Sequence, residues 1–193
     1  MINQFDHYLR SKAQFTDDEL QQIHACSIPL NLRRRQLLLR EGDVCRHKIF
    51  VLGGLLRTYR VRADGIESTM RFTIENGWSI DHESYVDQTP SNYRIEAMEE
   101  SSVLLWTREA MDELFDEIPT FKLLSDRLRE QSMNESLQRI FINISYTAEE
   151  KYDAFVNAFP DVFRRVPLHM VASYLGLSRE TLSRVRHKHH RVG

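Results

Sequence analysis

The sequence predicts an α+β protein with a strand-rich N-terminal half and a helical C-terminal half. Between residues 28 and 106, short apolar stretches, several of them alternating, are separated by turns such as Glu41-Gly42-Asp43 and Ala63-Asp64-Gly65. From residue 120 onward, the apolar residues instead recur mostly every three or four positions, which is typical of helices. Short strands with glycine-containing turns favour an antiparallel barrel or jelly roll.

Length and composition describe an ordinary globular chain. Its 193 residues, 41% hydrophobic and 28% charged, suffice for one large domain or two small ones. The longest apolar runs, such as residues 49–56, are too short to cross a membrane, and no signal peptide is visible. Cys26 and Cys45 give no disulfide framework. We therefore expect a cytoplasmic protein without membrane contact.

Two short helices are expected within residues 1–27, ahead of the strands. Thr16-Asp17-Asp18-Glu19 is a capping box, in which Thr16 and Glu19 satisfy each other's backbone amides at a helix start. The strands then follow as short runs up to Trp106. We expect them at residues 28–32, 37–39, 49–52, 55–61, 70–74, 93–98 and 103–106.

A short helix from Thr107 to about Pro119 precedes a long one, residues 120–144, which at ~1.5 Å per residue reaches roughly 37 Å. Its apolar stripe has one step of five residues, beside Gln131 and Ser132. We interpret the stripe as a homodimer seam; the alternative is a helix packed only on its own barrel. The expected seam residues are Phe121, Leu124, Leu128, Met133, Leu137 and Ile140.

The stretch after residue 145 indicates a second domain. Thr147-Ala148-Glu149-Glu150 is another capping box, so residues 144–146 are the expected hinge. Pro160 should end the helix that follows. The resulting division is a strand-rich domain at 1–118 that includes the N-terminal helices, a dimerisation helix at 119–145 and a helical domain at 146–193.

Residues 166–187 read as two helices around a tight turn. Leu168, Val171, Ala172 and Leu175 share one face, and Gly176 suits a left-handed helix end. Ser178 can cap the next helix, which should turn Leu182 and Val185 inward. This pattern is typical of a helix-turn-helix, whose second helix enters the DNA major groove; the alternative is an ordinary surface hairpin.

The second helix carries chemistry suited to a duplex. Arginine can donate two bonds to guanine, and a carboxylate can accept one from cytosine, whereas hydroxyls bind phosphates. From residue 164 onward the sequence has seven Lys or Arg residues, including Arg191, and one acidic residue, so the net charge of this segment is +6. Because the net charge of the whole chain is −2, residues 1–163 carry −8. Such a basic end favours a polyanion partner. The candidate DNA-contacting residues are Ser178, Arg179, Glu180, Thr181, Ser183 and Arg184.

The run SRETLSR, residues 178–184, closely resembles the recognition-helix motif of the Crp/Fnr family of bacterial transcription regulators. The upstream chain resembles that family over nearly its full length. The resemblance implies a double-stranded β-helix of the cyclic-nucleotide-binding type, a homodimer, base contact by Arg179, Glu180 and Arg184, and RNA polymerase as a further partner. Many relatives continue into a small β wing, whose backbone contacts we expect to be absent or supplied otherwise.

The resemblance also locates a ligand cassette. In nucleotide-binding relatives a Gly-Glu pair binds the ribose and an Arg-Ser pair the cyclic phosphate, around a short helix. Counting back from residues 94–97 places this cassette at residues 77–93, with Ile80-Asp81 and Ser91-Asn92 at the two pairs. Asp81 keeps a carboxylate, but the arginine is missing. Candidate ligand-binding residues are Ile80, Asp81, His82, Ser91, Asn92 and, by gapless counting on the long helix, Ser136.

The missing arginine argues against cyclic AMP. A charged hydrogen bond to a buried phosphate contributes on the order of 1.5–3 kcal/mol, where each ~1.4 is tenfold in affinity. Arg94 is the nearest substitute, yet its alternation with Ile95 points it outward. The open alternatives are a cyclic nucleotide, another small anion held by helix amides, and a roll that has lost ligand control. The sequence identifies no cofactor beyond such a small-molecule effector.

We expect neither a metal site nor an enzyme. Family members that sense through iron and sulfur use four cysteines, and His187, His189 and His190 fit a basic tail better than a metal site. Carboxylates such as Glu75 lack a partnered nucleophile. The sequence therefore predicts a sequence-specific DNA-binding transcription regulator; the alternative is a ligand-binding or protein-interaction module of the same fold that does not read DNA.

Overall fold

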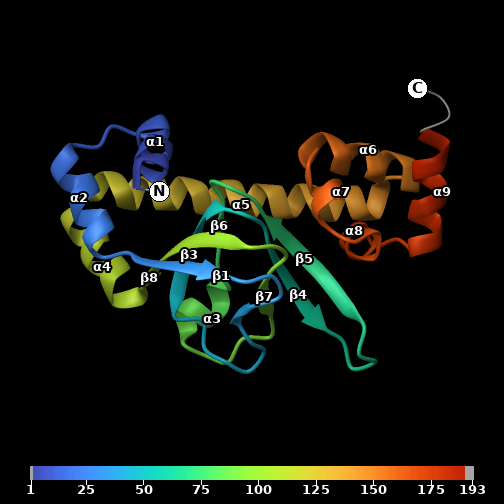
Figure 1. The fold of residues 1–193 in the computed structure, drawn as a ribbon, viewed down its shortest axis with the longest axis horizontal. Coiled ribbons are helices and arrows are strands. Elements are labelled where there is room, and N and C mark those ends of the chain that lie inside the picture. Colours follow the sequence, from blue (N-terminus) through green and yellow to red (C-terminus); the bar gives the residue numbers. More distant parts are fainter. Residues whose placement is uncertain (1, 190–193) are drawn as a thin grey trace. The chain divides into compact units, whose positions relative to one another are not determined.

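The structure of the protein, a computed structural model, describes residues 2–189 (Figure 1). His190 and Arg191, counted above with the basic tail, lie outside these residues. The chain forms two compact units. The first unit comprises Met1–Thr58 and Phe72–Gln131, and the second Tyr59–Arg71 and Ser132–Gly193. This division splits the long helix and groups a β-hairpin with the C-terminal helices, which the sequence did not suggest.

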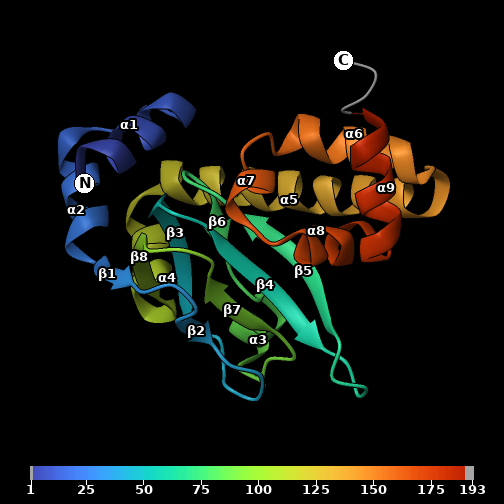
Figure 2. The same cartoon turned by 45° about the vertical axis from the view of Figure 1, so that its right-hand side comes forward.

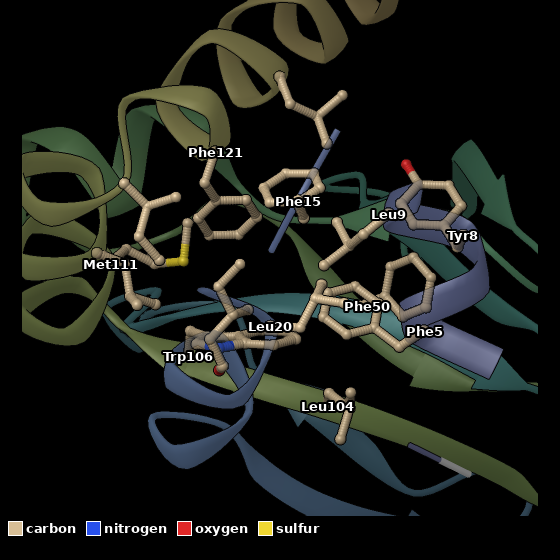
Figure 3. Packing of buried hydrophobic residues seen from close by; sticks show 14 of the residues in the cluster. Phe5, Tyr8, Leu9, Phe15, Leu20, Phe50, Leu104, Trp106, Met111 and Phe121 are labelled. Atoms are coloured by element: carbon tan, nitrogen blue, oxygen red, sulfur yellow. The ribbon is translucent and has the colours of Figure 1, made fainter. Parts of the chain in front are cut away.

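Two helices open the first unit, α1 (Ile2–Lys12) and α2 (Asp17–Ala25). The capping box predicted at α2 is confirmed, because the Thr16 hydroxyl accepts a hydrogen bond from the Glu19 amide and the Glu19 carboxylate accepts one from the Thr16 amide. Apolar side chains of both helices enter an aromatic-rich core with Phe50 and Trp106 (Figure 3). The Trp106 indole donates to the Ile23 carbonyl at 2.9 Å, which ties α2 to the sheet.

The strands form two four-stranded sheets, in the orders β1-β8-β3-β6 and β2-β7-β4-β5. This arrangement confirms the jelly roll of the predicted α+β fold. Pairing is antiparallel between β1 and β8, β3 and β8, β3 and β6, and β2 and β7. The strands are β1 (Ile28–Leu32), β2 (Leu37–Leu39), β3 (His47–Gly53), β4 (Leu56–Val61), β5 (Glu67–Thr73), β6 (Trp78–Ser79), β7 (Arg94–Ala97) and β8 (Ser101–Thr107).

Alternation along β3 separates the first unit into two cores. Ile49 and Val51 lie in the interior of the roll, where residues from both sheets meet Tyr85 of helix α3 (His82–Asp87). Phe50 and Leu52 face the opposite way, into the core formed with the helices. The roll interior is therefore filled with apolar side chains, and the other face of its sheet is covered by helices.

Helix α4 (Arg108–Glu117) leads into the long helix α5 (Pro119–Ser145), which begins with proline at a position that needs no amide donor. The predicted bounds of α5 are confirmed within a residue. The part of the chain from residue 2 to 189 contains no helix that is both long and apolar enough to span a membrane.

The predicted dimer seam needs a correction in its first half. Phe121 and Leu124 are only 2% and 4% exposed, because they pack into the first unit's own core (Figure 3). Leu128 is partly buried against the same core. Across the five-residue step the apolar stripe changes sides, and Met133, Leu137 and Ile140 are 65%, 54% and 51% exposed, followed by exposed Phe141 and Ile144.

Four further helices belong to the second unit: α6 (Ala148–Ala158), α7 (Val162–Arg165), α8 (Leu168–Leu175) and α9 (Arg179–His189). The capping box predicted at Thr147 is confirmed. The core of these helices is aromatic, with Phe155 contacting the rings of Phe159, Phe163 and Tyr174. This core packs α6 and α7 against α8, the first helix of the helix-turn-helix.

Candidate nucleic-acid interface and ligand cassette

The turn between α8 and α9 has the geometry of a helix-turn-helix. Gly176 adopts the left-handed conformation, with φ 64°, and the Leu177 amide donates to the Ala172 carbonyl at 2.9 Å, which closes the end of α8. Pro167 precedes α8 as its N-cap. Leu182 and Val185 are buried, as predicted.

Ser178 caps α9, since its hydroxyl accepts a hydrogen bond from the Thr181 amide at 3.1 Å. Arg179, Glu180 and Arg184 are exposed, whereas Thr181 and Ser183 are half-buried. The Thr181 hydroxyl oxygen accepts from Ser178 at 3.1 Å and from Arg184 at 3.4 Å. The structure thus gathers the six candidate residues at the start of α9, with two hydroxyls engaged in the cap.

Charges at this helix start alternate in sign. The pKa of Glu180 is lowered by its own backbone amide, by the Ser178 hydroxyl and by the positive charges of Arg179 and Arg184. The carboxylate is therefore ionised between two guanidinium groups. Donors and an acceptor are presented together, which is the set needed to distinguish base pairs in a major groove.

The far end of α9 is tied to α6. Lys188 lies 3.5 Å from the Glu149 carboxylate, His189 lies 3.4 Å from Asp153, and the His189 ring packs on Tyr152 with centroids 4.9 Å apart. Lys188 and His189 therefore lie away from the start of α9. Arg164 and Arg165 belong to another helix, α7. The basic residues of the C-terminal region are thus not all at the start of α9.

The predicted cassette contains α3, and Asp81 is its N-cap. The Asp81 carboxylate accepts from the Ser84 amide at 3.4 Å and from the Ser91 hydroxyl at 2.6 Å. Asp81 and Ser91 are only 7% and 3% exposed. The structure brings these two predicted ligand residues together, but they bind each other. A ligand hydroxyl could reach the carboxylate only by replacing Ser91.

The remaining ligand candidates are scattered. Ile80 packs against the roll interior, and His82 and Asn92 are exposed. Partial burial, with the positive charges of Arg129 and Lys48, lowers the pKa of His82. Ser136, in the second unit, is exposed and donates to the Ser132 carbonyl of its own helix at 2.8 Å.

Cations near the cassette strands are engaged by carboxylates. Arg94 is half-exposed and pairs with Glu41 at 3.2 Å, in agreement with the outward orientation predicted for it. Arg57, which the sequence reasoning missed, is 1% exposed and lies 3.2 Å from Glu96. No local sequence signal marks Arg57, because its burial follows from sheet pairing. Its charge is balanced within the first unit.

A cavity of about 340 Å³ lies elsewhere in the first unit, at the connection between β2 and β3. None of the predicted ligand-binding residues lines it. Its lining consists of Leu38, Leu39, Asp43, Val44, Cys45, Arg46, His47 and Ile49.

Comparison with known proteins matches both halves of this architecture. The profile of the cyclic nucleotide-binding domain matches residues 29–117. The transcriptional activator protein anr of Pseudomonas aeruginosa is 25% identical over 165 residues, covering 80% of this chain and 67% of its own. The structure of FixK2 from Bradyrhizobium japonicum has a TM-score of 0.74 at 18% identity, with 86% of each chain covered.

The regulator CLP of Xanthomonas campestris is similar in fold, with a TM-score of 0.72 at 14% identity and coverage of 92% and 93% of the two chains. The domain model covers the strands of the roll, whereas the other three matches cover 80% to 92% of this chain. The chain is therefore similar in sequence and in fold to regulators of the Crp/Fnr type. The cassette of this chain differs from the nucleotide-binding pattern in two ways. The arginine is missing, and Asp81 and Ser91 are hydrogen-bonded to each other.

Proposed function

We propose that this protein is a homodimeric, sequence-specific DNA-binding transcription regulator. The observation that carries the proposal is the start of α9, where Arg179, Glu180 and Arg184 are exposed on a backbone fixed by the Gly176 turn and the Ser178 cap. A recognition helix enters the major groove with its N-terminal residues against the base edges. Recruitment of RNA polymerase is the step at which bound protein would act on transcription.

The exposed stripe of α5 supports the dimer. Met133, Leu137, Ile140 and Ile144 follow spacings of four, three and four residues, which is the heptad pattern of a two-helix seam. A two-fold dimer places two recognition helices on half-sites about one helical turn, ~34 Å, apart. The proposed operator is therefore palindromic.

The effector we propose is a small ligand other than cyclic AMP. No arginine stands at the phosphate position, the Asp81 carboxylate is occupied by Ser91, and apolar side chains fill the roll. Calorimetry with cyclic AMP and cyclic GMP should give no saturable heat at micromolar protein. Saturation with a micromolar dissociation constant would contradict this part of the proposal.

A salt titration tests the DNA-binding function directly. Binding to a duplex should weaken linearly in log–log coordinates, with a slope of about −0.9 for each phosphate neutralised. A variant with Arg179→Ala and Arg184→Ala should show a weaker affinity and lose its preference for the operator over random duplex. A slope near zero in the parent protein would favour the interaction-module alternative.

A further inference from the structure

One edge strand of the second unit is bonded to the helix-turn-helix by a side chain. β5 is the terminal strand of its sheet, and its hairpin with β4 turns at residues 62–65, where the Gly65 amide donates to the Arg62 carbonyl at 2.9 Å. Helix α8 lies beside β5 (Figure 2), and its Ser173 contacts that strand. The Ser173 hydroxyl accepts from the Thr69 amide at 2.9 Å and donates to the Glu67 carbonyl at 2.9 Å.

These two bonds imitate strand pairing. A carbonyl at one residue and an amide two residues later point to the same side of a strand, and an adjacent parallel strand would bond to both. Here one hydroxyl occupies that place. Thr69 is 4% exposed, so its amide has little access to water if the hydroxyl is removed. Ser173 therefore connects α8 to the hairpin edge.

A second contact joins the same hairpin to the long helix. The Arg139 guanidinium of α5 donates to the Met70 carbonyl and lies over the Tyr174 ring, with its central carbon 5.1 Å from the ring centroid. Arg71, the next residue of β5, donates to the Ser132 hydroxyl of α5 at 2.7 Å. Adjacent α8 residues, Ser173 and Tyr174, are thus fixed to β5 and to α5 respectively.

We propose that Ser173 and Arg139 are positioning residues that set the half-site spacing this protein reads. Together they hold α8 against the part of α5 that carries the exposed apolar stripe. Because α9 packs on α8, this contact also fixes how far each recognition helix stands from the dimer seam. The inference rests on the proposed function and adds a determinant of specificity remote from the base-contacting residues.

Spacing is a sensitive readout of such a contact. One additional base pair between half-sites moves one of them by about 3.4 Å and about 35° around the duplex axis. A rigidly held pair of recognition helices cannot follow that displacement, whereas a loosened pair can. Base preference within each half-site should be independent of the contact, since Ser173 and Arg139 lie outside the start of α9.

The experiment measures affinity for a set of duplexes that carry the operator half-sites, selected in vitro, at the preferred spacing and at one or two base pairs more or less. The affinity of the parent protein should fall tenfold or more for each base pair by which the spacing departs from the preferred one. A variant with Ser173→Ala and Arg139→Ala should lose threefold or less, with unchanged affinity for a duplex carrying one half-site. Ser173→Thr keeps the hydroxyl. In a protein that retains Arg139, this variant should keep most of the parent's discrimination between spacings.

A matched control removes the same side-chain types from α5 where they hold nothing else. Ser145 and Arg127 are both exposed, so Ser145→Ala with Arg127→Ala should behave as the parent. Hydrogen exchange gives a DNA-free readout: the Thr69 amide should exchange at least tenfold faster in Ser173→Ala.

Three outcomes overturn the inference. Unchanged exchange at Thr69 shows that the hydroxyl does not hold the hairpin. Faster exchange with unchanged spacing discrimination shows that the contact exists but does not set spacing. Equal loss on single and double half-sites shows general damage to the fold. A parent protein that binds no duplex selectively instead overturns the proposed function itself, and this inference with it.

Discussion

Two helix starts in this protein illustrate how the same local chemistry can serve different purposes. Ser178 caps α9 and Asp81 caps α3, each with a side-chain oxygen that accepts from an amide three residues later. After Ser178, charged side chains stand exposed. Asp81 itself is buried and bonded to Ser91. Residue identity specifies the chemistry available at such a helix start, while burial decides whether a partner can reach it.

This difference in burial predicts that substitutions at the two places have different effects. Substitutions on the exposed surfaces of the second unit should reduce binding and leave stability unchanged. Substitutions in the buried cassette should reduce stability and leave DNA binding unchanged.

The largest effect is expected at the exposed stripe of α5. Leu137→Glu should place a carboxylate in the proposed seam, abolish the dimer in sedimentation equilibrium and lower operator affinity by about 10²- to 10⁴-fold, because two linked contacts become one. Gln138→Glu adds the same charge one position away and should remain dimeric. A Leu137→Glu protein that stays dimeric would place the seam elsewhere.

At the start of α9, Arg184→Ala should weaken operator binding by ~1–3 kcal/mol and relax the preference at one base position. Its melting temperature should stay within a degree of the parent's, because the side chain is exposed. Arg127→Ala removes an exposed arginine from α5 and should change neither quantity. Equal losses on operator and random duplex would show a phosphate contact instead of base reading.

In the cassette, Asp81→Ala should lower the free energy of unfolding by ~1–3 kcal/mol, since the Ser91 hydroxyl and the Ser84 amide lose their acceptor in a buried site. Denaturant titration measures this change. Asp87→Ala removes an exposed carboxylate at the end of α3 and should be nearly neutral. Operator affinity should be the same in both variants, and a selective loss in Asp81→Ala would link the cassette to DNA binding.

A further effect concerns the pH dependence of stability. Burial, reinforced by Arg129, lowers the pKa of Lys48 from 10.5 to about 8, while its amine lies over the Phe115 ring. Between pH 8 and 10 the unfolded chain holds this proton and the folded chain does not, so stability from this group rises with pH by up to ~1.4 kcal/mol per pH unit. Comparing parent with Lys48→Met should show this rise only in the parent.

Lys122→Met, on the exposed side of α5, provides the matched control for that pH series. Buried thiols and phenols such as Cys45 and Tyr85, whose pKa values are raised by burial, change stability in the opposite direction at alkaline pH. They are common to all three proteins, so the difference between parent and variant isolates Lys48. A constant difference from pH 7 to 10 would contradict the lowered pKa.

Signals within a few residues of each other predicted much of this structure. The capping boxes at Thr16 and Thr147, the Gly176 turn and the inward side chains of α9 all depend on local backbone geometry. Contacts across the fold were not predictable in this way. Nothing near Ser173 in the sequence indicates Glu67, 106 residues away, because their meeting depends on where a sheet edge lies.

The long helix shows the same limit within one element. Periodicity identified the apolar residues of α5. It could not tell whether Phe121 packs into the core of its own chain or into a dimer seam, because that depends on where the helix-covered face of the sheet lies. The five-residue step at Leu128 was the signal that a change of side had occurred. For the cassette, the spacing of ten residues between Asp81 and Ser91 gave no sign that a loop would bring them into contact.

That step gives α5 a rotational phase. Five residues turn a helix by about 500°, so the stripe resumes roughly 140° away from the line it left. Inserting a single alanine between Gln131 and Ser132 would preserve every apolar residue and still carry the downstream stripe a further 100° around the rod. In this helix, the number of residues between Leu128 and Met133 therefore sets the angle about the helix axis between the two hydrophobic faces.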